Sequence, residues 1–298
     1  MSLKQWLKHK ARSALGTQDI LAALSARGDG AAETKLARMY ARFLDPTLDD
    51  SALGFRKDQA PCLIDVNGDV LWLPGDLLPF IWHTHVDGLP AMVPRFLIET
   101  PHYVWIRERL APGNIAFDCG SNIGLFSIMM SGRVGAAGQV HAFEPSPGTC
   151  ADLRRVLRMN EITNVVVNEC ALADLTGQSE FYDVQVQNVR RESSHLVTTN
   201  SDTSSDPLPH ALRTVTTMTL DAYAARAGVM PQVIKIDVEG AEFSVLEGGR
   251  QTIQTAKPML VIEFHPDSTG RFDHQRLEIF LRHFGYSFQR ELKTYYCS

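Results

Sequence analysis

Apolar positions repeat along this chain with more than one spacing, and each spacing predicts a different kind of structure. In the first 45 residues the spacing is helical, as in the series Leu3, Trp6, Leu7, Ala11, Ala14 and Leu15. The last apolar stripe of this region stops at Pro46, which cannot continue a helix. The polar stretch 46–60 then reads as a linker. We therefore expect a helical N-terminal appendage over residues 1–58.

After residue 115 short apolar runs alternate with helical stretches. The runs predict strands at 115–118, 139–144, 165–168, 233–237 and 259–263. The intervening patterns predict helices at 122–131, 147–159, 241–255 and 273–284. This alternation is typical of βαβ units, so we expect an α/β fold with a doubly wound, mostly parallel sheet in a domain spanning 59–298.

Two interruptions of this rhythm carry their own predictions. The pair Asn67-Gly68 separates two apolar runs, which predicts a β-hairpin over 62–73, because the favoured two-residue turn needs positive φ at both positions. An insertion at 176–220 separates the third and fourth βαβ units, with a hairpin expected around 181–184 and a Ser/Thr-rich loop at 198–209. Loops of this length in a compact domain are usually functional or disordered.

Composition and charge narrow the function classes. The chain is 44% hydrophobic and 21% charged, which excludes a mostly disordered protein. Its 29 Lys and Arg against 34 Asp and Glu give a net charge of −5, which argues against a nucleic-acid partner. The longest apolar stretch is broken by prolines and a glycine at 74–79, too early for a membrane span. No signal peptide is visible, and five cysteines without a C-x-x-C pair favour reduced thiols in a cytoplasmic protein.

The N-terminal helix adds one possible partner. Lys4, Lys8 and Arg12 follow one another at i,i+4 positions without an acidic neighbour. Such a stripe favours an anionic surface, so residues 1–16 could make weak peripheral contact with the inner face of a membrane. The alternative is an ordinary solvated face of a helix packed on its own domain.

The most informative string is Phe117-Asp-Cys-Gly-Ser-Asn-Ile-Gly-Leu-Phe126, which follows a strand and opens a helix. Its D-x-G-x-x-x-G spacing is neither the dinucleotide G-x-G-x-x-G nor a P-loop, and it suits a nucleoside without a phosphate. Glu144, at the end of the next strand, stands where an acidic side chain accepts hydrogen bonds from ribose hydroxyls. The string therefore predicts a site for S-adenosylmethionine, with cofactor-binding residues Asp118, Gly120, Asn122, Gly124, Glu144 and Ala171.

Three motifs together resemble those of the FkbM-type methyltransferase family. They are the glycine-containing string, Val233-Ile-Lys-Ile-Asp-Val-Glu-Gly-Ala-Glu242, and Val261-Ile-Glu-Phe-His265. The resemblance covers about residues 110–265. It implies an S-adenosylmethionine-dependent enzyme, usually an O-methyltransferase of sugars or polyketide-type natural products. It also implies a seven-stranded sheet with an antiparallel last strand, for which 287–291 and 294–296 would supply the final hairpin. Cys119 and Ser121 depart from the commoner small residues.

The carboxyl ends of the fourth and fifth predicted strands collect the candidate catalytic groups. Methyl transfer to an aliphatic hydroxyl needs a base or a metal ion, because the hydroxyl is hardly ionised at neutral pH. His265 is the imidazole expected at this edge, and Asp237 and Glu239 are the other candidate catalytic residues.

Other interpretations of these side chains stay open. Glu263 could form a buried ion pair with Lys235, or it could hold a divalent metal ion such as Mg²⁺ together with Asp237. His83 and His85 form an H-x-H pair that could bind a metal ion or the substrate.

The sequence thus predicts an S-adenosylmethionine-dependent O-methyltransferase that acts on a sugar, a glycan or a glycosylated natural product. Two alternatives belong to other classes. One is an oxidoreductase of similar fold that uses NAD or a nucleotide sugar, and the other is a non-catalytic scaffold with a vestigial cofactor site.

Overall fold

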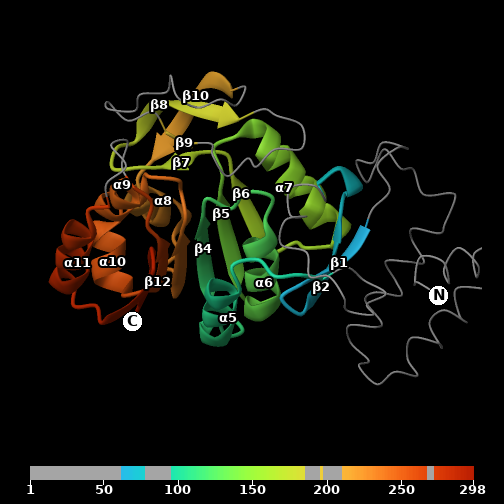
Figure 1. Ribbon diagram of the computed structural model, residues 1–298, viewed down its shortest axis with the longest axis horizontal. Helices are drawn as coiled ribbons and strands as arrows, with labels where there is room; N and C mark the ends of the chain where they lie inside the picture. Colours follow the sequence, from blue (N-terminus) through green and yellow to red (C-terminus); the bar gives the residue numbers. More distant parts are fainter. Residues whose placement is uncertain (1–61, 78–94, 185–194, 197–209, 267–271) are drawn as a thin grey trace, which may run out of the picture. The chain divides into compact units, whose positions relative to one another are not determined.

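The computed structural model of the chain describes residues 62–77, 95–184, 195–196, 210–266 and 272–298 (Figure 1). The predicted helical appendage, the His83–His85 pair and the Ser/Thr-rich loop lie outside these residues. The chain divides into two compact units, Met1–Leu97 and Ile98–Ser298, and each is described by itself.

The described part of the first unit is a three-stranded sheet. Strands β1 (Cys62–Val66) and β2 (Asp69–Leu73) pair antiparallel, and β3 (Arg95–Phe96) pairs parallel with β1. The short 3-10 helix η1 (Gly75–Leu77) follows β2. Asn67 and Gly68 connect the first two strands with φ of 50° and 96°. The hairpin predicted from the Asn-Gly pair is therefore confirmed.

The second unit is built on a seven-stranded sheet in the order β13-β14-β12-β11-β4-β5-β6. Its strands are β4 (Ile115–Cys119), β5 (Gln139–Phe143), β6 (Val165–Asn168), β11 (Val233–Ile236), β12 (Met259–Glu263), β13 (Phe288–Glu291) and β14 (Thr294–Cys297). Strand β14 pairs antiparallel with both neighbours, and the pairings among β4, β5, β6, β11 and β12 are parallel. The α/β fold class and the predicted seven-stranded sheet with its final hairpin are confirmed.

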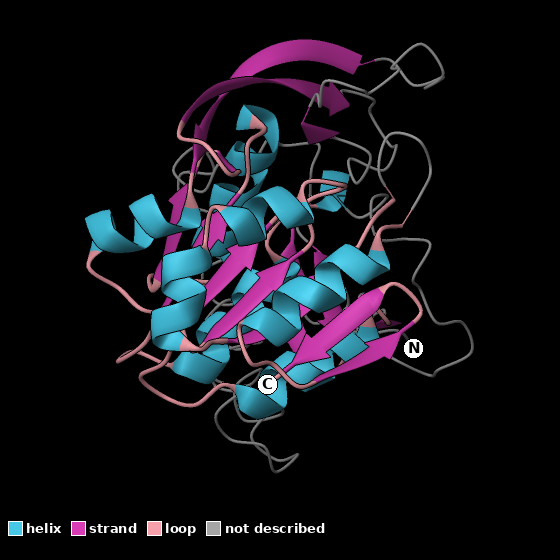
Figure 2. Cartoon of the chain, turned by 90° about the vertical axis from the view of Figure 1, so that its left-hand side faces the viewer, coloured by secondary structure: helices cyan, strands magenta, loops and turns pink. Residues whose placement is uncertain are grey.

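Helices lie against the strands of this sheet (Figure 2). They are α5 (Thr100–Arg109), α6 (Leu125–Val134), α7 (Pro147–Met159), α8 (Leu220–Ala227), α9 (Glu242–Glu247), α10 (Arg250–Ala256) and α11 (His274–His283). No helix in the described ranges combines the length and the apolarity needed to cross a membrane. The periodicity analysis predicted four of these helical regions. It missed α5, whose apolar residues show almost no helical periodicity, and α8, which has only eight residues.

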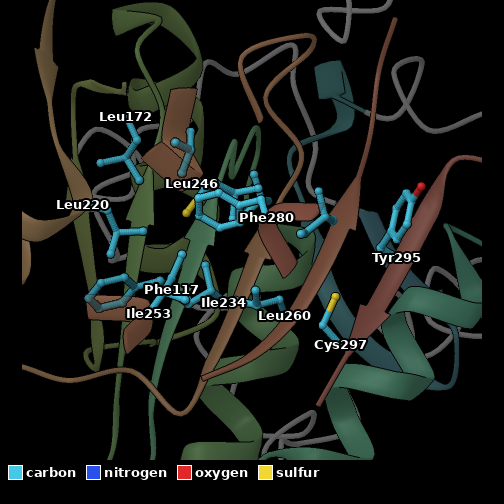
Figure 3. Packing of buried hydrophobic residues seen from close by; sticks show 14 of the residues in the cluster. Phe117, Leu172, Leu220, Ile234, Leu246, Ile253, Leu260, Phe280, Tyr295 and Cys297 are labelled. Atoms are coloured by element: carbon cyan, nitrogen blue, oxygen red, sulfur yellow. The ribbon is translucent and has the colours of Figure 1, made fainter. Parts of the chain in front are cut away.

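Alternation of side chains along the strands gives the sheet two different faces. On one face Phe117, Ile234 and Leu260 pack against Leu220, Ile253 and Phe280 from α8, α10 and α11 (Figure 3). The intervening residues, which include Asp118 and Lys235, turn to the opposite face, where Lys235 lies over the ring of Phe126 in α6. The polar residues of the site thus leave the sheet on the α6 side.

Glycines explain two differences between predicted and observed helices. The helix expected from residue 122 begins at Leu125, because Asn122 and Gly124 have positive φ, 48° and 90°. The helix expected over 241–255 is divided into α9 and α10 at Gly248. A Cβ on Gly248 would lie 2.1 Å from the carbonyl oxygen of Ala173, so this backbone is held close to another segment.

The insertion forms a second sheet, in the order β7-β10-β8-β9. Its strands are β7 (Ala171–Leu172), β8 (Gly177–Val184), β9 (His195–Leu196) and β10 (His210–Met218). Strand β8 pairs antiparallel with β10 along its full length and with β9 at its end. The strand expected around 181–184 therefore exists, and its main partner comes from beyond the Ser/Thr-rich loop.

Candidate active site

The glycine loop connects β4 to α6 and lies between the ends of β5 and β11. The backbone N–H groups of Gly120 and Ser121 both donate to the carbonyl oxygen of Phe143 at 3.0 Å. Gly120 has a φ of +78°, and a Cβ there would lie 1.8 Å from the carbonyl oxygen of Asp237. The loop can thus pass directly over the end of β11 only because residue 120 of the D-x-G motif has no side chain.

Glu144 holds the same loop from its other side. Its Oε2 accepts a hydrogen bond from the N–H of Asn122 at 3.1 Å, and its Oε1 accepts one from the N–H of Ser146 at 2.9 Å. Burial raises the pKa of Glu144 to about 7, although both hydrogen bonds oppose that effect. The predicted ribose acceptor therefore lies at the glycine loop, with its orientation fixed.

Lys235 connects the glycine loop to the catalytic edge. Its ammonium group donates to Oδ2 of Asp237 at 3.1 Å and to the carbonyl oxygen of Gly120 at 3.3 Å, and lies 3.7 Å from Oδ1 of Asp118. The ion pair with Glu263, one of the two interpretations left open for that residue, is not the one that Lys235 forms. Asp118 stands directly opposite Lys235 in the sheet register, whereas Val261 occupies that position on β12, so the nearer acids receive the ammonium.

Asp118 is fully buried at the start of the loop. Its Oδ2 accepts a hydrogen bond from Oγ of Ser127 at 2.6 Å, whereas Oδ1 has no hydrogen-bond partner. Burial raises the pKa of Asp118, and the nearby Lys235 opposes that effect. A buried carboxylate oxygen without a hydrogen bond costs free energy of folding. We therefore infer that Asp118 has a role other than packing.

Ala171 lies apart from these contacts in the described structure. It belongs to β7 in the insertion sheet, where it forms a small buried cluster with Phe181 and Val215. Its assignment to the cofactor site stays a prediction.

The predicted catalytic histidine is held by a buried glutamate. Glu242, the first residue of α9, is 1% exposed, and its Oε1 accepts hydrogen bonds from Nδ1 of His265 at 2.8 Å and from the N–H of Gly240 at 3.0 Å. The same carboxylate accepts the backbone N–H of His265 at 3.4 Å. Because Nδ1 donates to Glu242, the Nε2 atom of His265 is left as the reactive nitrogen.

Carboxylates surround that nitrogen. Nε2 of His265 lies 3.6 Å from Oε2 of Glu239, 3.6 Å from Oε1 of Glu263 and 4.0 Å from Oδ1 of Asp237. Burial alone would lower the pKa of His265, but the Glu242 hydrogen bond and the Glu239 charge raise it to about 9. Burial also raises the pKa of Glu239, to about 8. The arrangement therefore favours a strongly basic imidazole, and it brings all three predicted catalytic residues together.

Lys293, in the turn between β13 and β14, completes the cluster. Its ammonium group lies 3.2 Å from Nε2 of His265 and pairs with Oε1 of Glu263. An ammonium group has no acceptor, so this contact fits the neutral ring with Nε2 accepting, the form that a pKa of about 9 makes dominant only at alkaline pH. The two ring nitrogens of His265 thus contact Glu242 and Lys293 respectively.

The metal ion considered for Asp237 and Glu263 finds no support in this geometry. Lys235 neutralises Asp237, and Lys293 neutralises Glu263, so each carboxylate already has an ammonium partner. In the described part of the chain, donor atoms of Asp237 do lie within 4.8 Å of those of Glu239 and His265, but the ammonium group of Lys293 lies 3.2 Å from Nε2 of that histidine. Between Asp237 and Oε1 of Glu263, side-chain ammonium groups thus take the place that a metal ion would have.

The sequence predicted which residues meet at the carboxyl ends of β11 and β12, but not which of them contact one another. Glu242 was noted in the fourth-strand motif without a role, and Lys293 was not considered. The only signal for Glu242 is its position two residues after Gly240, where the tight turn folds its carboxylate back over residues 238–240. No local signal identifies Lys293, because its contacts come from the antiparallel hairpin.

Comparisons with known proteins extend this picture. The profile of the methyltransferase FkbM domain matches residues 118–288. Methyltransferase 1 of Beauveria bassiana (strain ARSEF 2860) is 28% identical over 143 residues, which cover 44% of this chain and 56% of that protein. The 31-O-demethyl-FK506 methyltransferase FkbM of Streptomyces tacrolimicus is 29% identical over 180 residues, which cover 52% of this chain and 67% of that protein. The chain therefore spans little more than half of the first relative.

Solved structures give a looser likeness. A methyltransferase FkbM from Methylobacillus flagellatus KT superposes with a TM-score of 0.43 at 19% identity, over 67% of this chain and 51% of that chain. A SAM-dependent methyltransferase from Aquifex aeolicus gives a TM-score of 0.35 at 14% identity, over 84% of this chain and 99% of that chain.

Proposed function

The chain belongs to the methyltransferase FkbM domain family, and from this premise we propose that it transfers a methyl group from S-adenosylmethionine to a hydroxyl group. The observation that carries the proposal is the Glu242–His265 pair, which lies at the same sheet edge as the glycine loop. A cofactor loop and an oriented base are the two components that such a reaction needs.

The residues around the glycine loop fit this cofactor. Glu144 would accept hydrogen bonds from the ribose hydroxyls, and the loop from Gly120 to Gly124 would lie against the nucleoside and the amino acid part. Oδ1 of buried Asp118 accepts no hydrogen bond and offers a further acceptor at the start of the loop. When bound, S-adenosylmethionine supplies an activated methyl carbon, so the protein need only orient the acceptor and remove its proton.

His265 takes that proton in its neutral form, so with a pKa of about 9 for this residue turnover should rise from neutral to alkaline pH. Its Nδ1–H donates to Glu242, so the ring presents the lone pair of Nε2 in a fixed direction. An acceptor hydroxyl would replace Lys293 as the donor to Nε2, and the proton would pass from the hydroxyl oxygen to that nitrogen. The carboxylates of Glu242 and Glu239 would then stabilise the imidazolium ion.

The surroundings of His265 support an acceptor with several hydroxyl groups, such as a sugar. Asp237, Glu239 and Glu263 place carboxylate oxygens within 4.0 Å of Nε2, and carboxylates accept hydrogen bonds from neighbouring hydroxyls. The name of the Streptomyces relative also describes transfer to an O-demethyl compound, which supports oxygen as the acceptor atom.

The test compares turnover in two histidine variants. With a panel of sugars and glycosylated natural products, S-adenosylhomocysteine formation identifies an acceptor for the parent protein. We expect His265→Ala to lower turnover by about 10²–10⁴-fold while cofactor affinity hardly changes. His283→Ala, which removes an exposed histidine at the end of α11, is the matched control. Full activity in His265→Ala would reject the assigned base, and absence of product from the parent across the panel would reject the acceptor class.

A further inference from the structure

A second cluster of side chains that could bind a metal ion lies beside His265. None of the donor atoms of this cluster takes part in the proposed proton transfer. Glu99 and His102 stand at the start of α5, Glu263 ends β12, and Thr294 begins β14. Donor atoms of Glu99, His102 and Glu263 lie within 4.8 Å of one another. Residues from three elements far apart in the sequence therefore converge on one point.

The distances match those between the ligands of a metal ion. Nδ1 of His102 lies 3.3 Å from Oε2 of Glu99 and 3.5 Å from Oε2 of Glu263. Ligand atoms in a tetrahedral zinc site, with bonds of about 2.0–2.2 Å, lie about 3.3–3.6 Å from one another. Both distances from Nδ1 of His102 thus match such a site, and the two carboxylate oxygens lie within 4.8 Å of each other.

The protein does not supply hydrogen-bond partners for all the polar atoms of this cluster. Oε2 of Glu263 is buried without a hydrogen-bond partner, whereas Oε1 of the same carboxylate pairs with Lys293. A proton on Nδ1 of His102 can point to only one carboxylate oxygen at a time, although two lie at similar distances. A cation placed among the three atoms would satisfy both oxygens and the nitrogen together.

The imidazole is also held as metal-binding histidines are. Nε2 of His102 lies 2.9 Å from Oγ1 of Thr294, a hydroxyl that is 3% exposed. When Nε2–H donates to that hydroxyl, the lone pair of Nδ1 faces the two carboxylates. A partner on the second ring nitrogen that fixes tautomer and orientation is the usual support of a histidine ligand.

We propose that Glu99, His102 and Glu263 bind one divalent transition-metal ion, for which Zn²⁺ is the best match. One imidazole nitrogen and two carboxylate oxygens favour zinc over magnesium, which prefers oxygen ligands alone. Three protein ligands leave a fourth position open for an oxygen of water or of a small molecule. The site does not depend on the proposed methyl transfer, so either proposal can fail without the other.

Calorimetric titration of the metal-stripped full chain with ZnCl₂ tests the assignment. We expect one saturable site per chain, at least about 100-fold weaker in His102→Ala and unchanged in the exposed-histidine control His283→Ala. Glu99→Gln provides a second ligand variant, because its side chain is 36% exposed and its loss leaves the core intact. MgCl₂ should not compete at equal concentration. Co²⁺ in place of Zn²⁺ gives an independent signature, with visible absorption typical of four-coordinate cobalt.

Three results would overturn the proposal. One is a parent protein without a saturable zinc site, and another is a site that both His102→Ala and Glu99→Gln leave unchanged. The third is loss of the site in His265→Ala but not in His102→Ala, which would assign the ion to Asp237, Glu239 and His265 instead.

Discussion

Glu144 and Glu242 are buried carboxyl groups that receive hydrogen bonds from different donors. Glu144 receives two backbone N–H groups, and burial still raises its pKa to about 7. Glu242 receives the imidazole of His265 in addition to backbone N–H groups of the turn before α9. The first is therefore near its titration point at neutral pH, whereas the second acts as the fixed partner of a base.

The pKa of Glu144 predicts how cofactor affinity depends on pH. Only the ionised carboxylate accepts from both ribose hydroxyls, so affinity for S-adenosylmethionine should fall as pH decreases from 8 to 6. The limiting loss is about 1.4 kcal/mol per pH unit below a pKa of about 7. Calorimetry at several pH values measures this, and Glu144→Gln should bind weakly with a flatter profile. The same slope in the variant would assign the dependence to another group.

Glu242 should act as a positioning residue. Glu242→Gln keeps the size of the side chain but weakens its hold on Nδ1 of His265, so we expect kcat to fall about 10–10²-fold. KM for the cofactor should hardly change, because Glu242 has no contact with the glycine loop among the described hydrogen bonds. Glu247→Gln, at the half-buried last residue of α9, is the matched control. A change confined to thermal stability, with kcat intact, would show that Glu242 serves the fold alone.

At the scale of elements, two close approaches of the backbone build the site. The glycine loop passes over the end of β11 at Gly120, and α9 gives way to α10 where Gly248 meets Ala173. The first approach brings the cofactor loop to Asp237 and Lys235. The second divides one long amphipathic pattern into two helices, so that α9 ends at Glu247 and α10 begins at Arg250.

The approach at Gly120 has a measurable cost when a methyl group is added. Gly120→Ala combines positive φ with a Cβ 1.8 Å from a carbonyl oxygen, so the free energy of unfolding should fall by about 2–5 kcal/mol. Gly113→Ala is the matched control, because Gly113 has a φ of +86° but no atom within 4 Å of the added Cβ. It should lose about 1–2 kcal/mol. Equal losses in denaturant unfolding would mean that the close approach is not what requires glycine.

At the scale of the whole molecule, the sequence predicts features that depend on neighbouring residues. It does not predict contacts between residues far apart in the chain. The parallel strands β4 and β11 are buried on both faces, so they read as apolar runs and were located to within one residue. The turn at Asn67 was found because its dipeptide requires positive φ. By contrast, the contact of His102 with Thr294 spans 192 positions and depends on the antiparallel β14, which no local pattern describes.

The same distinction separates the two halves of the site. The glycine loop and Glu144 follow from spacing within one βαβ unit, so the sequence placed them together, as the structure does. Their role in cofactor binding stays a prediction. The pairing of Lys235 was predicted wrongly, because parity along the strands places Glu263 and Asp118 on one face but does not say which lies opposite. The partners of His265 required the folded hairpin that carries Lys293.

The measurement that tests the central claim most directly is calorimetric titration of the full chain with S-adenosylmethionine and, separately, with NAD. The account predicts one S-adenosylmethionine bound per chain, no binding of NAD, and a loss of about 1–3 kcal/mol in Glu144→Ala through the lost ribose hydrogen bonds. Binding of NAD in place of S-adenosylmethionine, or no heat with S-adenosylmethionine and its homocysteine product, would contradict it.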